Sequence, residues 1–68
     1  MEMIPVKSTH IEAIGHEGTT LTVAFRNGGV YSYHDFPSEE FDKLLAADSV
    51  GKHFGAHVRG KYEHVKHA

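Results

Sequence analysis

The sequence predicts an α+β domain: a three-stranded antiparallel meander with two C-terminal helices packed on one face, in the order β-β-β-α-α. Three observations support this prediction. Apolar and polar residues alternate along residues 20–26, Asn27 and Gly28 follow as a typical hairpin-turn pair, and after Pro37 the apolar residues recur at helical spacing. With 68 residues, the chain is expected to form one domain over residues 1–68.

The first predicted strand covers residues 6–14, which are rich in β-branched side chains. Ile11 and Ile14 stand three apart rather than two, so a β-bulge or a bend is expected near Ala13. Two glycines within residues 15–18 predict the turn into the second strand. The apolar side chains on one face of that second strand are Leu21, Val23 and Phe25.

The length of the next hairpin loop decides where the two tyrosines of the returning strand point. A two-residue loop, Asn27-Gly28, would put Tyr31 and Tyr33 on the face opposite the apolar residues of the second strand, as an exposed stacking platform. A three-residue loop, with Gly29 as the permissive residue of a bulge, would put them on the same face. Only the longer loop gives the sheet one apolar and one polar face. We therefore predict that both tyrosines share the apolar face and that at least one is mostly buried.

The two helices are predicted from their start signals and their apolar stripes. Pro37 suits the first turn of one helix, and Glu39 and Glu40 lie favourably against its N-terminal dipole. Ser49 is expected to cap a second, shorter helix, which its glycines weaken. The tail, residues 61–68, has the alternation of a short extended piece. The apolar stripes are Phe41, Leu44 and Leu45 in the first helix and Val50, Phe54 and Val58 in the second.

Several classes of function find no support in the sequence. The chain has no cysteine, so disulfides and thiolate metal sites are excluded. It has no apolar leader and no apolar run near the roughly 20 residues of a membrane span, so we expect no membrane association and a cytoplasmic location. It also lacks a nucleophile elbow, a phosphate-binding loop and a dinucleotide-binding fingerprint. We therefore expect a protein that is not an enzyme and has no cofactor.

The charge is distributed unevenly along the chain. Residues 1–49 carry a net charge of −5 and residues 50–68 a net charge of +3, with four of the seven histidines in the second segment. An anionic partner is therefore expected to meet the C-terminal third. The alternative is a solvated basic tail without a ligand.

Two function classes are consistent with these features. In the first, the protein is a small non-catalytic module for RNA or a nucleotide, whose cations meet phosphates and whose tyrosines stack on bases. In the second, it is a protein-interaction adaptor or a self-associating homo-oligomer that uses an exposed sheet edge. The candidate anion- and nucleic-acid-binding residues are Arg59, Lys61, Lys52, Tyr31, Tyr33 and Tyr62.

Arg59 is the leading single candidate, because its planar guanidinium suits bidentate contact with phosphate. The alternative for Arg59 is a salt bridge to the acidic first helix. We expect Arg59 and Lys61 to contribute more to anion binding than Arg26 or Lys7, which stand in the acidic segment.

We expect no metal site, although one pair of histidines has a spacing that could hold a metal ion. His53 and His57 stand four apart on the predicted second helix and could hold one ion, with His64 or His67 as a third ligand. The pair lacks the glutamate of an H-E-x-x-H motif, and a solvated pair is the alternative.

An ordered set of residues from Val6 to Tyr62 matches a known pattern. It consists of Ser8, Ile11, Ile14-Gly15, Leu21, Val23, Phe25, Asn27-Gly28, Tyr31, Tyr33, Pro37, Leu44, Ala47, Ser49, Gly51, Phe54 and Arg59 through Tyr62. This set resembles the KTSC domain family, a module found alone in bacterial and phage proteins and at the C-terminus of some lysyl-tRNA synthetases. The resemblance implies RNA binding, places an arginine at position 59, and implies no established activity.

The chain departs from the family pattern at three positions. His16 and His53 stand where the family usually has aromatic residues, and Gly55 stands where it usually has asparagine. A ligand site built on those aromatic and amide side chains is weakened in this chain.

Overall fold

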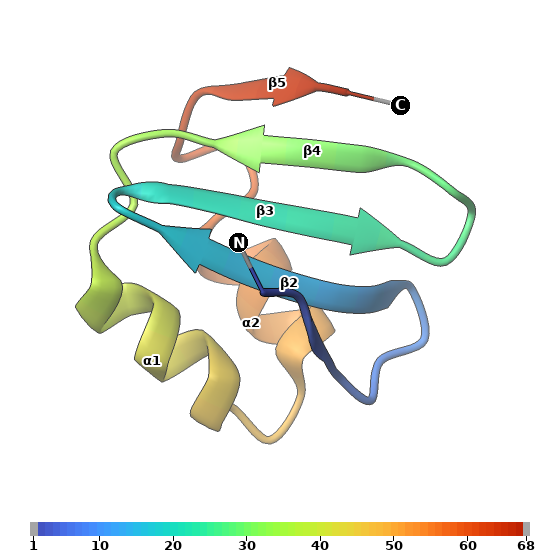
Figure 1. Ribbon diagram of the computed structural model, residues 1–68. Coiled ribbons are helices and arrows are strands. Elements are labelled where there is room, and N and C mark those ends of the chain that lie inside the picture. The colour runs from blue at the N-terminus through green and yellow to red at the C-terminus, as the bar shows by residue number, and fades with distance from the viewer. Residues whose placement is uncertain (1, 68) are drawn as a thin grey trace.

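The computed structural model describes residues 2–67 as a single sheet with two helices on one of its faces (Figure 1). The sheet is antiparallel throughout, in the order β1-β2-β3-β4-β5. The predicted α+β class and the two helices are confirmed. In chain order the elements are β1 (Ile4–Pro5), β2 (Ile11–Glu17), β3 (Thr20–Phe25), β4 (Val30–Tyr33), α1 (Ser38–Ala46), α2 (Val50–His57) and β5 (His64–Lys66).

The predicted three-stranded meander is wrong in its strand number, because the sheet has five strands. The two additional strands, β1 and β5, are its edges and are two and three residues long. The short extended piece predicted in the tail is confirmed as β5, although its pairing with β4 was not predicted. β1 completes only one period of alternation, so hydrophobic patterning does not reveal it. The chain reaches β5 only after both helices, and β5 then pairs with β4 along the open side of the meander (Figure 1).

The first hairpin differs from the prediction in its boundaries. The strand predicted for residues 6–14 is β2, which begins at Ile11 and continues through the segment assigned to a turn. The turn itself is shorter: Glu17 pairs with Thr20, and Gly18 has a φ of +63° at the first of the two loop positions. The predicted bulge is confirmed, since the pairing with β3 shifts register between Ile11 and Ala13.

The second hairpin has the predicted three-residue loop. The amide of Phe25 donates to the carbonyl of Gly29 at 2.8 Å, and the amide of Gly28 donates to the carbonyl of Phe25 at 3.0 Å. Gly28, with a φ of +97°, is the permissive residue of this loop, so the assignment of that role to Gly29 is wrong. Tyr31 lies opposite Val23 in the ladder, so the predicted face of the tyrosines is confirmed.

The helices begin where the sequence indicates and close the core. The backbone of Pro37 caps α1, and the Ser49 hydroxyl accepts a hydrogen bond from the amide of Lys52 at the start of α2. Neither helix, within the described part of the chain, is long and apolar enough to cross a bilayer. The buried apolar core consists of Ile11, Ile14, Leu21, Val23, Tyr33, Phe36, Phe41, Leu44, Val50, Phe54 and Val58.

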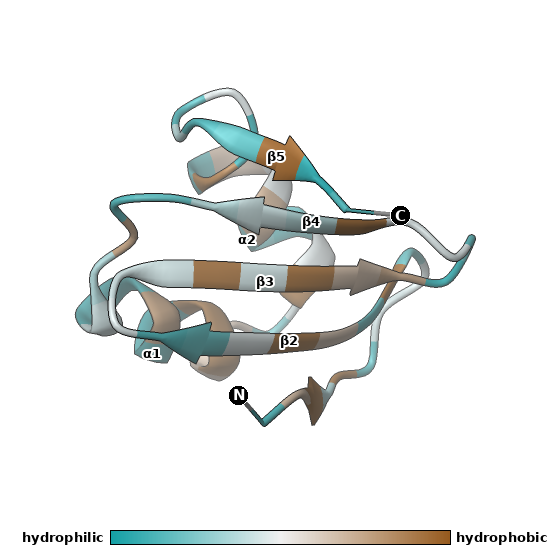
Figure 2. Ribbon diagram, turned by 45° about the horizontal axis from the view of Figure 1, so that its top comes forward, coloured by the Kyte–Doolittle hydropathy of each residue, from teal (hydrophilic) through white to brown (hydrophobic). Residues whose placement is uncertain are grey.

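Hydrophobic residues alternate with more polar ones along β3 (Figure 2), and Thr22 of β3 and Ser32 of β4 lie on the face without helices. Ser32 is buried there, and its hydroxyl lies 2.7 Å from Nε2 of His67 and 3.4 Å from the hydroxyl of Thr22. The amide of His67 also donates to the carbonyl of Val30, which extends the pairing of β5 by one residue. The tail therefore ties the last edge strand to both the backbone and the side chains of β4.

Candidate ligand-binding groove

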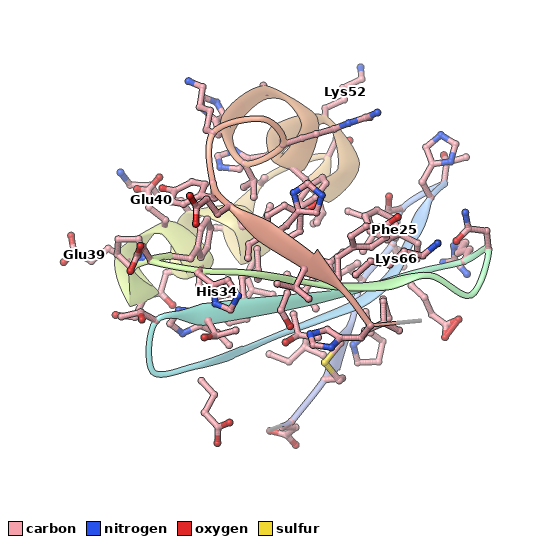
Figure 3. All side chains as sticks on the ribbon, turned by 90° about the horizontal axis from the view of Figure 1, so that it is seen from above. Phe25, His34, Glu39, Glu40, Lys52 and Lys66 are labelled. Atoms are coloured by element: carbon pink, nitrogen blue, oxygen red, sulfur yellow. The ribbon has the colours of Figure 1, made fainter. Side chains whose placement is uncertain are left out.

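An open groove lies on the helix side of the sheet, between the β3–β4 hairpin, α2 and β5. Its volume is about 790 Å³. We call it the α2–β5 groove. Figure 3 shows Phe25 and Lys66, two of its lining residues, on this side of the sheet. The residues that line it are His10, Ile11, Phe25, Asn27, Gly28, Gly29, Tyr31, Tyr33, Gly51, Phe54, Gly55, Arg59, His64 and Lys66.

Aromatic rings form one wall of the groove and join it to the core. The ring of Phe25 meets Tyr31 edge to face at 5.5 Å and Phe54 at 5.7 Å. Tyr33 is only 5% exposed and packs edge to face on Phe54 at 5.3 Å. Tyr31 is half-buried and lines the groove, and its ring has the rings of Phe25 and His64 as neighbours. The two tyrosines therefore divide the roles that the sequence left open: one completes the core and the other faces the groove.

The groove is cationic. Of the residues that line it, Arg59 and Lys66 carry full positive charges and none carries a carboxylate. Burial raises the pKa of the Tyr33 phenol, and the neighbouring Tyr31 adds to this shift. The positive charge of Arg59 acts in the opposite direction on the same pKa, which places the guanidinium within electrostatic reach of the Tyr33 hydroxyl. A phosphate in the groove would meet the same charge.

The structure brings together half of the predicted ligand residues. Arg59, Tyr31 and Tyr33 line the groove, whereas Lys61 and Lys52 do not. Lys52 borders a smaller hollow beside Ser8 and Ser49, and Figure 3 shows its side chain on α2, directed away from the sheet.

Tyr62 also lies outside the groove. Its ring packs edge to face on Phe36, with 4.9 Å between ring centroids. Tyr62 is thus partly buried against the core, next to the segment that precedes α1. Tyr62 is therefore not part of the groove that Tyr31 lines.

Sequence reasoning missed the contribution of the last strand to the groove. Lys66 lies opposite Tyr31 and His64 lies opposite Tyr33, so all four side chains share one face of the sheet. The His64 ring lies 5.6 Å from that of Tyr31 and 5.3 Å from that of Tyr33. The signal was the alternation His64-Val65-Lys66, which puts both polar residues on the same side once the segment is treated as a strand.

The salt-bridge alternative for Arg59 is not observed in the described part of the chain, and Arg26 differs from Arg59 in its contacts. The salt bridge recorded within residues 2–67 joins Lys43 to Glu40 on α1, so Arg59 is not engaged with the acidic first helix there. Arg26, in contrast, has a structural contact: its Nε donates to the carbonyl of Ser8 at 2.8 Å. Arg59 is therefore the more available of the two for a ligand.

The histidine pair of α2 lies apart from the groove. The rings of His53 and His57 are 4.5 Å apart between centroids and 39° apart in plane. Within residues 2–67, no group of three or more metal-ligating side chains comes together, so neither His64 nor His67 joins the pair.

These features define a class of protein: a small α+β domain with an antiparallel sheet, two helices on one face, and a cationic, aromatic-walled groove beside the second helix. The chain belongs to the KTSC domain family, whose model matches residues 7–62. The crystal structure of a KTSC domain protein from Yersinia pestis superposes with a TM-score of 0.94, at 29% identity over 98% of this chain and 97% of that one.

Relatives by sequence include both small proteins and an enzyme. A protein of Tsukamurella paurometabola is 38% identical over 65 residues, which are 93% of this chain and 97% of that protein. An uncharacterized protein of Stutzerimonas stutzeri is 36% identical over 56 residues, or 79% of each chain. A lysine–tRNA ligase of Nostoc punctiforme is 39% identical over 44 residues, which are 65% of this chain and 8% of the ligase. The descriptions of the family and of the small relatives name no catalytic activity.

One departure from the family pattern has a structural role in this chain. His16 stacks on Phe41 of α1, with 5.1 Å between ring centroids and 22° between planes. Its Nε2 lies 2.7 Å from the carbonyl oxygen of Phe36. His16 therefore keeps the packing of an aromatic residue and adds a hydrogen bond to the segment before α1.

Proposed function

We propose that this domain is a non-catalytic binding module for RNA or nucleotides, and that the α2–β5 groove is its ligand site. The observation that carries the proposal is the composition of the groove: Arg59 and Lys66 without any carboxylate, beside the half-buried ring of Tyr31. In this arrangement the two cations hold a phosphate and the ring stacks on a base.

The chemistry of these residues suits the two parts of a nucleotide. The guanidinium of Arg59 is planar and contacts two phosphate oxygens at once, while the Lys66 ammonium acts as a point charge. Stacking of a base on an aromatic side chain contributes about 1–3 kcal/mol and tolerates any base. The ligand expected from this combination is a nucleotide or a short single strand recognised with little sequence preference.

The distribution of charge along the chain favours the approach of an anion from the groove side. The segment that supplies Arg59 and Lys66 has a net charge of +3, and the acidic residues Glu39 and Glu40 stand on α1, outside the groove. Figure 3 shows both glutamates on the opposite side of the molecule from Lys66. A phosphate is thus attracted to the groove and repelled from the first helix.

The relatives are consistent with an RNA ligand. One of them is a lysine–tRNA ligase, whose name places a tRNA among its substrates, and the match covers 8% of its length. A domain this small beside a complete enzyme is more suited to holding the RNA than to performing the reaction.

The competing proposal, a protein-interaction surface, has weaker support. The exposed large apolar residues are Ile4 at 37% and Val65 at 48%. They stand on opposite edge strands, and their ladder partners Ile14 and Ser32 point to opposite faces of the sheet. They do not form one apolar patch, which a stable protein contact would use.

The test is a titration of the ¹⁵N-labelled domain with a short single-stranded RNA and with mononucleotides, followed by affinity measurements at increasing salt. We expect shift changes centred on the groove, and affinity that falls steeply between about 50 and 200 mM salt. Arg59→Gln and Lys66→Gln should each weaken binding and reduce the slope of log affinity against log salt by about 0.7. Lys61→Gln is the matched control, because Lys61 belongs to the same basic segment but does not line the groove.

Two results would contradict the proposal. Equal losses in Arg59→Gln and Lys61→Gln would mean diffuse attraction to the basic segment without a site. Absence of binding at low salt to RNA, DNA and nucleotides would favour the protein-interaction alternative.

A further inference from the structure

The geometry points to a second site, separate from the groove: we propose that His53 and His57 form a two-histidine site for a divalent transition-metal ion of the Zn²⁺, Ni²⁺ or Cu²⁺ class. The two residues stand one turn apart on α2, which runs from Val50 to His57. Their ring centroids are 4.5 Å apart. Imidazole nitrogen is a preferred ligand for these ions.

The separation of the rings matches what a shared ion requires. A metal ion lies about 2.0–2.1 Å from an imidazole nitrogen, and therefore about 3.2 Å from the ring centroid. Two rings that bind the same ion at an angle of about 90–109° then have centroids about 4.5–5.2 Å apart. The observed 4.5 Å lies in this range, so the helix backbone need not change. Rotation about the broad torsion at each ring suffices to aim one nitrogen of each at a common point.

The two rings are available for this role. His53 is half-buried and His57 is exposed, so an ion reaches them directly from solvent. Among residues 2–67, the histidine rings that make hydrogen bonds are those of His16 and His67. The rings of His53 and His57 contact each other instead.

The ligand count defines what kind of site this is. No third histidine or carboxylate joins the pair within residues 2–67, so water completes the coordination. A site with two protein ligands is open and binds an ion reversibly, unlike a closed four-ligand structural zinc site. By the general order of divalent metal affinities, Cu²⁺ binds most tightly.

The proposed site lies on the flank of α2 that faces away from the groove. At about 100° per residue, His53 and His57 stand on one side of the buried stripe of Val50 and Phe54, while Gly51 stands on the other. Gly51 lines the α2–β5 groove and the two histidines do not. The metal site and the RNA site therefore share no lining residue, and each can be tested with its own variants.

A bound ion would act as a clamp on a weak helix. Two interior glycines lower the intrinsic stability of α2 by up to about 1 kcal/mol each relative to alanine. An ion that needs both rings one turn apart binds the folded helix more tightly than the unfolded chain, so it stabilises the fold by mass action. Because α2 carries Phe54 to the groove wall, the ion would also hold that wall in place.

The experiment uses the full chain and the metals alone. Substoichiometric Cu²⁺ should broaden the amide resonances of residues 52–58 first. Calorimetry with Zn²⁺ should give one ion per chain, and added Zn²⁺ should raise the melting temperature. His53→Gln and His57→Gln should each weaken Zn²⁺ binding at least about tenfold and abolish the rise in melting temperature, because one imidazole is lost. The control is His34→Gln, since His34 is an exposed histidine outside α2.

The broadening map uses the unmodified chain, so it holds whether or not a variant folds, and circular dichroism checks the helix content of each variant. Broadening centred on other histidines would overturn the proposal. So would unchanged Zn²⁺ affinity in His53→Gln and His57→Gln, or a stoichiometry of half an ion per chain, which would mean a site shared between two copies.

Discussion

At the scale of single residues, the alternation of the sequence gives the direction of a side chain but not its depth. Tyr31 and Tyr33 alternate with Ser32, and both point to the helix side as predicted. Tyr33 lies opposite Leu21 and packs on Phe54, so it is buried. Tyr31 lies two pairs closer to the hairpin loop, where it lines the open groove. Depth depends on where the helices end over the sheet, and local pattern does not contain that information.

The buried phenol of Tyr33 should make the fold sensitive to alkaline pH. Its pKa is raised above 10.0, first by burial and then by Tyr31. The folded state therefore favours the neutral phenol: this stability is fully present below the pKa of the unfolded chain and is lost as pH rises through the folded pKa. Ultraviolet titration of the phenolate should show one tyrosine that ionises last, and Tyr33→Phe should remove that phase. Ionisation of all three tyrosines together in the folded protein would contradict this.

At the scale of elements, the long or strongly signalled ones were predictable and the tail was predicted to be extended, whereas β1 and the pairing of β5 with β4 were not predicted. The helix stripes, the Ser49 cap and the loop of the β3–β4 hairpin follow from local chemistry that is complete within a few residues. The predicted turn at residues 15–18 failed because Gly15 is a buried strand residue, and a glycine inside a strand has the same sequence signal as a glycine in a turn. The edge strands form through tertiary pairing, which propensity does not encode.

The glycines of α2 should respond to substitution in opposite directions. A Cβ at Gly55 would meet nothing within 4 Å, so Gly55→Ala should raise the free energy of unfolding by up to about 1 kcal/mol through helix propensity. A Cβ at Gly51 would lie 2.9 Å from the hydroxyl oxygen of Ser8, which accepts the amide hydrogen of Ile11. Gly51→Ala should therefore lower the free energy of unfolding by about 1 kcal/mol or more, as expected for overpacking.

Urea denaturation of the two variants side by side measures both effects. A gain in stability for Gly51→Ala would mean that the Ser8 loop moves away at little cost. A loss for Gly55→Ala would mean that this glycine has a structural role that the packing does not explain.

At the scale of the whole molecule, the candidate site is assembled from parts of the chain that sequence reasoning treats separately. Arg59 and the tyrosines were predictable as residue types, but their meeting depends on β5 returning beside β4. Lys61 and Tyr62 lie in the segment that connects α2 to β5, outside the groove. Charge along the sequence indicated the segment that supplies the two cations of the groove, while the alternation within β5 places Lys66 on the groove side.

The last strand should be required for a monomeric protein but not for the core. All buried apolar residues of the described chain lie between Ile11 and Val58, so a chain that ends after Tyr62 keeps the core. It loses the hydrogen bonds of β5 to β4, each with a net contribution of about 0.5–1.5 kcal/mol, and we expect a decrease of about 2–4 kcal/mol in the free energy of unfolding. It also exposes the edge of β4, and an unpaired strand edge is a template for association with another chain.

Thermal melting of the truncated chain should show a folded but less stable domain, and light scattering should show a mass that rises with concentration. Val65→Lys is the control, because this exposed side chain on an intact β5 should leave both stability and mass unchanged. A truncated chain that stays monomeric at high concentration, or that does not fold, would contradict this account of the sheet.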